Sequence, residues 1–465
     1  MTAPDGVSRH DDHLADWLAQ PEPAGIGDVV RFDHAKQQWH IWDGFRWAPD
    51  KTTLIIDMIR AKGMQYIEEA HDGDDRKAFL TLLDISKKQG VLKSLAARRG
   101  IAMAGDEWDP DPTLIAFTNG VLDMKTGEFN TAPSPDLLLS RSTRQPYDPA
   151  ASAPWFARFL QEVMGDDVGL TNYLAHVLGY SLFGWQREQK FWMWVGQGQN
   201  GKGTLAKVMT HALGDYADSP SAELYMKTRF GAARSDAARP DLLRLQGVRF
   251  TWMSEPQGGR FAEETLKAHT GDDPIQGRDL YGKAASFTTF RPSHTIIFLT
   301  NDPPRTEDVG ASMQRRAKVI KFEQDFRGTR DDKGLEDKLK LEAPGILNLL
   351  TSLAMERVNG GLYVTIPEPE QVTTWSSEYI EENDPLSAFI QDACVVSPGV
   401  SSSAALLWGA YQDWCARTNT DEMSRTGLGL ALGRRFQRRK TSQTYVYLRI
   451  RPKSAMETAE SGDDD

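Results

Sequence analysis

The stretch VGQGQNGKGTLAKVM, residues 195–209, decides the fold. It overlaps the apolar run FWMWV at residues 191–195, which is long enough for a buried strand. The apolar spacing of LAKVMTHAL after Thr204 favours a helix, and Gly214 is a helix-stop signal. Glycines between a strand and a helix let backbone N–H groups wrap a phosphate at the positive end of the helix. The stretch therefore predicts an α/β fold with a nucleotide-binding loop.

The residue types in this loop assign roles to particular positions. Gly196 and Gly201 frame a Gly-x4-Gly-Lys pattern, in which the Lys202 ammonium is expected to reach the β- and γ-phosphate oxygens. ATP and Mg²⁺ are the expected cofactors. The residues expected to bind the nucleotide are Gly196, Gly198, Asn200, Gly201, Lys202, Gly203 and Thr204.

The loop departs from the usual pattern at one place. Gly203 follows the lysine where a hydroxyl ligand to magnesium normally stands, so the Thr204 hydroxyl has to take that role. Nucleoside monophosphate kinases show a similar Gly-Lys-Gly-Thr, which keeps a nucleotide kinase open as an alternative. Those kinases begin near the loop and need an arginine-rich lid, whereas 195 residues precede Gly196 here.

Two downstream strands are expected to end in polar residues beside this loop. Residues 247–256, GVRFTWMSEP, predict a strand that ends at Glu255, whose carboxylate can deprotonate the attacking water. Residues 294–302, HTIIFLTND, predict a strand that ends at Asn301, whose amide can orient the same water. Strand-end polar residues are often simply solvated, but their order and spacing favour catalysis. Thr204 and Glu255 are the expected magnesium ligands.

The composition bounds the class of protein. A chain of 465 residues, 40% of them hydrophobic, indicates about three domains, and it contains no apolar stretch long enough to predict a membrane span. Cys394 and Cys415 lack metal-ligand spacing and suit a reducing cytosol. The net charge of −11 counts mildly against a protein coated by nucleic acid, although the local charge balance matters more.

The pattern along the chain predicts its organisation. The first residues are polar and aperiodic, and a hairpin around Asp43-Gly44 and several helices follow them. We expect a flexible leader at 1–24, an N-terminal region of hairpin and helices at 25–150, a nucleotide-binding core at 151–365, a winged-helix domain at 380–455 and an acidic tail at 456–465.

The C-terminal module is strongly basic. Between Arg425 and Lys453 there are nine Lys or Arg and no Asp or Glu. Its helix–helix–helix–strand order fits a winged helix, whose third helix enters the major groove of DNA. A charge run is usually a solvated face, but such a run in an acidic protein favours DNA. The residues expected to bind duplex DNA are Arg434, Arg435, Arg438 and Arg439 on the third helix and Lys440 in the loop after it.

Several motifs together carry a family resemblance. Residues 196–202, SEP, LKAHTGDDPIQGRDLYGK, FLTND and RRAKVIKF, in that order, resemble a superfamily 3 helicase. The sequence is most similar to the helicase part of phage and plasmid primase–helicases, which are related to the poxvirus primase–helicase. FTNGVLDMKTGEF and LGYSLFG upstream, and LLWGAYQDWC downstream, extend the resemblance over residues 25–455.

The resemblance implies a role for further residues. Asn301 matches the polar sensor and Arg316 the arginine finger, which acts on the nucleotide of a neighbouring subunit. The stretch between Arg278 and Thr288 corresponds to a hairpin in the ring channel, where Lys283 is expected to grip a DNA phosphate beside Tyr281. The residues that fall in the family's extra motif are Lys267, Asp272, Asp273 and Arg278.

The resemblance also implies an activity and partners. It implies an AAA+-like P-loop ATPase core that assembles into a homo-hexameric ring. This ring would move on single-stranded DNA and unwind duplex, as the replicative helicase of a phage, prophage or plasmid. The implied location is the bacterial host cytoplasm. No acidic pair typical of primer synthesis is present, so a separate primase is an expected partner. Gly203 and Ser254 replace customary magnesium ligands, which keeps a DNA-binding initiator with an impaired ATPase as another alternative.

Overall fold

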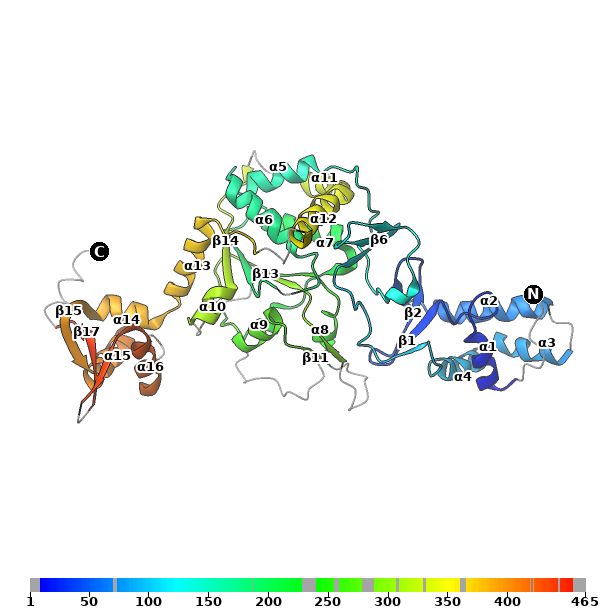
Figure 1. The fold of residues 1–465 in the computed structure, drawn as a ribbon, viewed down its shortest axis with the longest axis horizontal. Coiled ribbons are helices and arrows are strands. Elements are labelled where there is room, and N and C mark those ends of the chain that lie inside the picture. Colours follow the sequence, from blue (N-terminus) through cyan, green and yellow to red (C-terminus); the bar gives the residue numbers. More distant parts are fainter. Residues whose placement is uncertain are drawn as a thin grey trace. The chain divides into compact units, whose positions relative to one another are not determined.

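The computed structural model describes residues 9–69, 73–185, 187–227, 240–254, 259–277, 288–306, 309–328, 332–359, 365–418, 420, 422–441 and 444–454. The chain forms two compact units, which are described separately (Figure 1). The first unit comprises residues 1–304 and 316–373, and the second comprises residues 305–315 and 374–465.

The N-terminal part of the first unit packs helices beside a small sheet of order β3-β2-β1-β4. Trp17 is 2% exposed and its ring lies 4.9 Å from those of Tyr66 and Phe79. The elements are α1 (Asp11–Leu18), β1 (Val30–Asp33), β2 (Gln38–Trp42), β3 (Trp47–Pro49), α2 (Leu54–Glu69), α3 (Gly73–Leu80), α4 (Ile85–Leu95) and β4 (Ala102–Met103).

The expectation of a flexible leader over residues 1–24 is wrong from Asp11 onward. Helix α1 begins there, and its Leu14, Trp17 and Leu18 are buried in the core formed with α2 and α4. The three side chains recur at helical spacing, and their burial stabilises the helix. The charged residues between them make this apolar pattern hard to recognise in the sequence. Residues 1–8, and the expected acidic tail at 456–465, lie outside the described residues.

The centre of the first unit is a parallel sheet of order β14-β8-β13-β10-β9. This confirms a mixed α/β fold. The apolar residues of β8 and β13 are buried on both faces, as in parallel sheets covered by helices. The sheet strands are β8 (Phe191–Val195), β9 (Ala217–Asp218), β10 (Phe250–Ser254), β13 (Thr295–Thr300) and β14 (Ala317–Lys321).

Helices cover this sheet on two sides. Figure 1 shows α5, α6, α11 and α12 together above the strands, and α8, α9 and the β11–β12 pair below them. The other helices of this unit are α5 (Pro154–Val163), α6 (Val168–Tyr180), α7 (Lys202–Leu213), α8 (Pro240–Leu243), α9 (Glu263–Thr270), α11 (Leu335–Leu341) and α12 (Ala343–Asn359). Helices α10 (Ala311–Arg316) and α13 (Glu370–Glu382) have most of their residues in the second unit. The remaining strands are β5 (Leu114–Phe117), β6 (Gly120–Asp123) and β7 (Phe129–Asn130), which form one antiparallel sheet, and β11 (Ile275–Gly277) and β12 (Thr288–Phe290), which form another.

The second unit has its own core beneath a three-stranded sheet of order β15-β17-β16. Phe389, Tyr411 and Trp414 form an aromatic cluster at its centre. Its elements are α14 (Pro385–Ala393), β15 (Cys394–Ser403), α15 (Ala404–Thr418), α16 (Arg425–Arg435), β16 (Arg438–Lys440) and β17 (Tyr445–Pro452).

Two predictions about this unit are wrong. The third helix ends at Arg435, so Arg438 and Arg439 lie on β16 and not on the helix, and Lys440 lies on the same strand and not in a loop. Phe436 has an extended backbone (φ −122°), and β16 then pairs antiparallel with the β-branched and aromatic residues of β17. The expected helix–helix–helix order also omitted β15, which pairs with β17.

Candidate nucleotide site

The glycine loop begins where β8 ends and leads directly into α7. Gly198 and Gly201 have φ of +90° and +87°, a left-handed conformation that favours glycine. A Cβ on Gly201 would lie 2.6 Å from Val163 Cγ1 of α5, so a side chain there is excluded by contact as well. Glycine therefore shapes the loop at Gly201, which belongs to the Gly-x4-Gly-Lys pattern, and at Gly198, which that pattern leaves open.

Backbone and amide hydrogen bonds tie the loop to the segment that follows β14. Asn200 is 3% exposed, and its Nδ2 donates to the Phe322 carbonyl at 3.1 Å. The backbone N–H of Phe326 donates to the Gln199 carbonyl at 3.0 Å. Asn200 thus acts by holding the loop in place, because its amide is turned into the protein.

Lys202 is the first residue of α7 and is 6% exposed. Its Nζ donates to the Gly196 carbonyl at 2.5 Å, which places the ammonium inside the curve of the loop. The N–H groups of the first turn of α7 have no acceptor within the helix, and they add positive potential at the same place. The loop therefore concentrates positive charge where an anion would be bound.

A cavity of about 340 Å³ lies between this loop and the ends of β10 and β13. Ligands of parallel α/β sheets bind at this edge, outside the carboxyl ends of the strands. The structure brings together most of the predicted site here, and adds Lys207, Leu299 and Thr300, which the sequence analysis missed. The cavity is lined by Gly198, Gln199, Asn200, Gly201, Lys202, Gly203, Thr204, Lys207, Ser254, Leu299, Thr300 and Asn301.

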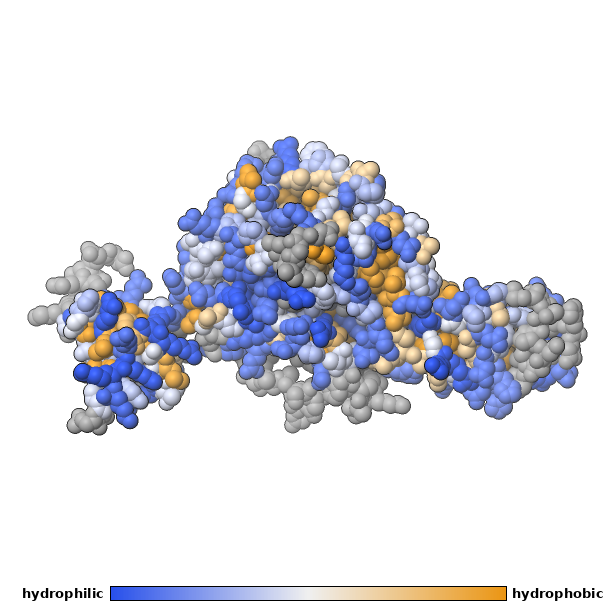
Figure 2. Space-filling model, in the orientation of Figure 1, coloured by the Kyte–Doolittle hydropathy of each residue, from blue (hydrophilic) through white to orange (hydrophobic). Residues whose placement is uncertain are grey.

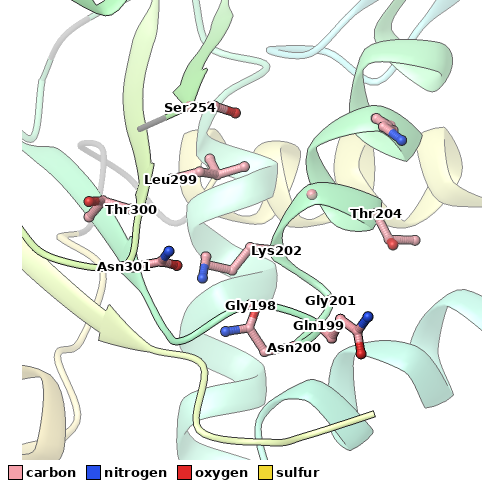
Figure 3. Close-up of a pocket in the computed structure, with 12 residues that line it drawn as sticks. Gly198, Gln199, Asn200, Gly201, Lys202, Thr204, Ser254, Leu299, Thr300 and Asn301 are labelled. Carbon is pink, nitrogen blue, oxygen red and sulfur yellow. The ribbon is translucent and has the colours of Figure 1, made fainter. Parts of the chain in front are cut away.

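The positions of the polar side chains differ around the loop. Figure 3 shows Lys202 and Asn301 on one side of it, and Thr204 with Gln199 on the other. Glu255 follows Ser254 in the sequence, but it lies outside the described residues, so its catalytic and metal-binding roles stay predictions. The same holds for Arg278, Tyr281 and Lys283 of the expected hairpin, whose flanking strands β11 and β12 are antiparallel.

The donor groups fit a magnesium site only in part. Within the described ranges, no three His, Cys, Asp or Glu side chains converge as metal ligands. The hydroxyls of Ser254 and Thr204 line the cavity, whereas Gly203 offers none. Because Thr204 lies on the far side of the loop from Lys202, its role as a magnesium ligand, which stays a prediction, requires its side chain to turn (Figure 3).

Replacing Gly203 by serine is expected to strengthen the site. Gly203 is exposed, its φ is not positive, and a Cβ there would meet no atom within 4 Å, so the new side chain fits. The hydroxyl would stand at the usual magnesium-ligand position. We expect the magnesium concentration for half-maximal ATPase activity to fall about fivefold, since a hydrogen-bond-strength contact is worth about 1 kcal/mol. Gly203→Ala is the matched control, and an equal effect of alanine would exclude the hydroxyl as the cause.

Arg316, the expected arginine finger, is the last residue of α10. It is half-buried, and its Nε donates to Thr270 Oγ1 at 3.2 Å. Thr270 is fully buried at the end of α9, and its hydroxyl in turn donates to the Leu266 carbonyl at 2.6 Å. The guanidinium is therefore anchored to the helix that precedes the β11–β12 strands, while the neighbouring Arg315 is exposed.

The basic residues of the second unit are not equivalent. Arg435 forms an ion pair with the buried Asp384 and donates to Ser387, so it supports the fold of this unit. The Arg438 guanidinium lies 4.7 Å from the centre of the Tyr445 ring. On the face shown in Figure 2, a band of strongly hydrophilic residues crosses this unit. The remaining predicted residues, all exposed, are Arg434, Arg439 and Lys440.

The fold and the site define an α/β protein with a glycine loop at the carboxyl edge of a parallel sheet. Residues 12–165 match the family model described as D5 N terminal like. A protein of Acanthamoeba polyphaga mimivirus is 27% identical over 330 residues, which cover 66% of this chain and 33% of that protein. A relative from Invertebrate iridescent virus 6 is 27% identical over 280 residues, which cover 55% of this chain and 27% of that protein. A relative from Frog virus 3 (isolate Goorha) is 26% identical over 406 residues, which cover 70% of this chain and 41% of that protein. All three proteins are named as candidate helicases.

The chain is therefore similar to the phage and poxvirus-like primase–helicase family. The chain spans 33% of the length of the mimivirus relative and 27% and 41% of the other two. Two solved structures of the C-terminal region of NrS-1 are also similar. One is 14% identical, covers 78% of this chain and 75% of that chain, and has a TM-score of 0.45. The other is 11% identical, covers 91% of this chain and 96% of that chain, and has a TM-score of 0.49. Among the described residues, no helix is both long and apolar enough to span a membrane.

Proposed function

We propose that the protein is an ATP-dependent DNA helicase with an AAA+-like P-loop core. One observation carries the proposal: the buried Lys202, Asn301 and the end of β10 line one cavity at the carboxyl edge of a parallel sheet. This arrangement offers a nucleoside triphosphate a phosphate cradle on one side and water-orienting groups on the other. The names of the viral relatives support unwinding as the use of that hydrolysis.

The proposed mechanism assigns one task to each residue. The loop N–H groups and Lys202 hold the phosphates and balance the charge that develops on the γ-phosphoryl group. Asn301 orients the attacking water, and Glu255 accepts its proton. Thr204, Ser254 and Glu255 are the groups on this chain that would hold magnesium, which would supply neutralising charge to the phosphates.

The proposed assembly is a homo-hexameric ring, because Arg316 as a finger needs the nucleotide of a neighbouring subunit. In this ring Lys283 and Tyr281 hold single-stranded DNA in the channel. Their contacts to phosphate and base faces make binding dependent on salt and largely indifferent to sequence. We propose a role at replication initiation in a virus or mobile element, with a separate primase supplying primers.

The second unit is proposed to be a winged helix that binds duplex DNA. Its α14–β15–α15–α16–β16–β17 order supports this proposal, with α16 as the recognition helix and β16–β17 as the wing. Arg434 lies at the end of α16, and Arg438, Arg439 and Lys440 follow on the wing strand. Four cations close together in the chain suit contact with the phosphate backbone.

Replacing Arg439 and Lys440 by glutamine is expected to weaken duplex binding without unfolding the unit. Both side chains are exposed on β16, and the loss of two phosphate contacts lowers the slope of log affinity against log salt by about 2. Fluorescence anisotropy with a labelled duplex at several salt concentrations measures this slope. Arg435→Gln is the contrasting variant, because its ion pair with Asp384 predicts a lower melting temperature of the unit instead.

ATP hydrolysis by the purified protein with Mg²⁺, with and without single-stranded DNA, tests the proposed function. Hydrolysis that DNA stimulates supports the motor, and unwinding of a forked duplex is then the next measurement. Hydrolysis that DNA does not change, together with phosphate transfer to a nucleoside monophosphate, would establish the nucleotide kinase instead.

Gly203 and Ser254 favour a second candidate, a DNA-binding initiator with an impaired ATPase. The open space at Gly203 supports it, since among the described residues, its two chain neighbours aside, no atom lies within 4 Å of the place where a Cβ would stand. This candidate predicts that the protein binds duplex DNA through the second unit and hydrolyses no ATP at any magnesium concentration.

A further inference from the structure

A second cavity, of about 420 Å³, also borders the glycine loop. It shares Gln199, Gly201 and Thr204 with the first cavity. The two cavities are therefore neighbours at the loop, as a ligand that extends from one into the other requires. The volume is also within the range of about 300–1,000 Å³ that is typical of small-molecule sites.

Three aromatic side chains line this second cavity together with charged and polar residues. Phe159 of α5 is 3% exposed and packs under the loop, where a Cβ on Gly201 would lie 3.2 Å from its ring. Trp155, one turn earlier, is 48% exposed at the cavity edge, and Phe326 is half-buried on the segment after β14. Helix α5 thus presents one ring that supports the loop and another whose surface is open to a ligand. The half-exposed Trp155 thus offers ring surface to a ligand that enters the cavity.

The backbone around these rings is held in place from both sides. The Glu342 carboxylate accepts from the N–H groups of Trp155 and Phe156 at 3.1 and 2.9 Å, which fixes the start of α5. The Lys338 ammonium lies 5.4 Å from the centre of the Trp155 ring. Phe326 is fixed by the hydrogen bond of its N–H to the Gln199 carbonyl. The slot is therefore formed before any ligand enters, so little ordering opposes binding.

The carboxylates at the rim are paired with cations. Glu162 accepts from Arg158 at 2.7 Å, and Asp332 accepts from Lys338 at 2.7 Å. Glu336 accepts from Lys340 at 2.6 Å and from Lys207 at 3.2 Å, and the hydrogen bond from Lys340 lowers its pKa. These ion pairs neutralise the rim, so the slot does not repel the nucleotide whose phosphates lie at the loop. Lys338 contacts one face of the Trp155 ring, and the exposed remainder of Trp155 and the Phe326 ring are available to a ligand.

We propose that this aromatic slot holds the nucleobase of the triphosphate, stacked against Trp155 and Phe326. The inference rests on the proposed function, because it takes the phosphates to lie at the glycine loop. It assigns Trp155 a binding role in the same site, although 46 residues separate it from Gly201 in the sequence. Stacking of a base on an aromatic side chain is worth about 1–3 kcal/mol, so the slot supplies a measurable part of the affinity.

The test compares a ligand that has a base with one that has none. Isothermal titration calorimetry with ATP and with inorganic tripolyphosphate, both with Mg²⁺, is carried out on the wild-type chain, Trp155→Ala, Phe326→Ala and Trp155→Phe. We expect Trp155→Ala and Phe326→Ala to weaken ATP binding about tenfold and to leave tripolyphosphate binding unchanged. Trp155→Phe is expected to recover most of the ATP affinity, because it keeps an aromatic face.

The possible outcomes separate the slot from the loop. Equal weakening of both ligands by Trp155→Ala would indicate a structural effect on α5 and overturn the inference, as would unchanged ATP binding in both alanine variants. Lys202→Ala is expected to weaken both ligands, since it removes a phosphate contact. If the wild-type chain bound neither ligand, the proposed function itself would fail. In steady-state kinetics, Trp155→Ala is expected to raise the KM for ATP and leave kcat nearly unchanged, the signature of lost uniform binding.

Discussion

Lys202→Ala is expected to reduce ATP turnover at least about a hundredfold, to the background of the assay. Lys202 is 6% exposed, and its ammonium lies within the curve of the glycine loop, where it is positioned before substrate binds. Water that fills the space left by the side chain cannot replace the ammonium charge, because the charge on the γ-phosphoryl oxygens develops in a partly desolvated site. Steady-state release of phosphate at saturating Mg²⁺ and single-stranded DNA measures the effect.

Lys207→Ala is the matched control for this prediction. Lys207 lies on the same helix and lines the same cavity, but its side chain is 58% exposed and pairs with Glu336. We expect this variant to keep turnover within about threefold of the wild-type chain, since exposed ion pairs contribute little. Melting curves and duplex binding by the second unit establish that both variants are folded. Turnover that survives in Lys202→Ala would show that the nucleotide site has been assigned wrongly.

The strand, loop and helix around Lys202 were predictable because their signals are local. The apolar run at residues 191–195 coincides with β8, and α7 ends at Leu213 with Gly214 in a left-handed conformation as its C-cap. Strand, glycine turn and helix stop are each encoded within a few residues of where they act. The α/β class follows from the same signals. The site roles given to Glu255 and Lys283 stay predictions.

Other features depend on contacts between distant parts of the chain. β16 consists of three basic residues, and only their pairing with β17 makes them a strand, so the sequence pattern extended the preceding helix through them. Helix α1 carries its apolar stripe between acidic residues, and the burial of Trp17 against Tyr66 and Phe79 could not be read from that short stretch alone. Tertiary packing places residues of α5 beside the loop, where they line the second cavity together, and no local sequence pattern encodes this packing.

Arg316→Ala is expected to reduce turnover at least about a hundredfold in assembled rings while leaving ATP binding intact. An arginine finger stabilises charge only in the transition state, and its removal typically costs about 10³–10⁵ in turnover. The hydrogen bond from Arg316 Nε to Thr270 restricts the positions that the guanidinium can take. Steady-state ATPase assays and nucleotide titrations on the same preparation separate the loss of turnover from the loss of binding. Arg316→Lys is expected to stay impaired, because an ammonium lacks the planar fork of the guanidinium.

Mixing subunits distinguishes a finger that acts in trans from an arginine that supports its own site. Arg316→Ala subunits keep Glu255, and Glu255→Gln subunits keep Arg316, so each supplies what the other lacks across a shared boundary. In an equal random mixture, about a quarter of the sites combine the two intact residues, and turnover should recover to about that fraction of the wild-type value. Arg315→Ala, which alters the exposed neighbouring guanidinium, is expected to keep most of its turnover when assayed alone. If light scattering shows rings but the mixture does not recover turnover, Arg316 acts within its own subunit. If Arg315→Ala loses turnover alone and regains it when mixed with Glu255→Gln subunits, Arg315 is the finger instead.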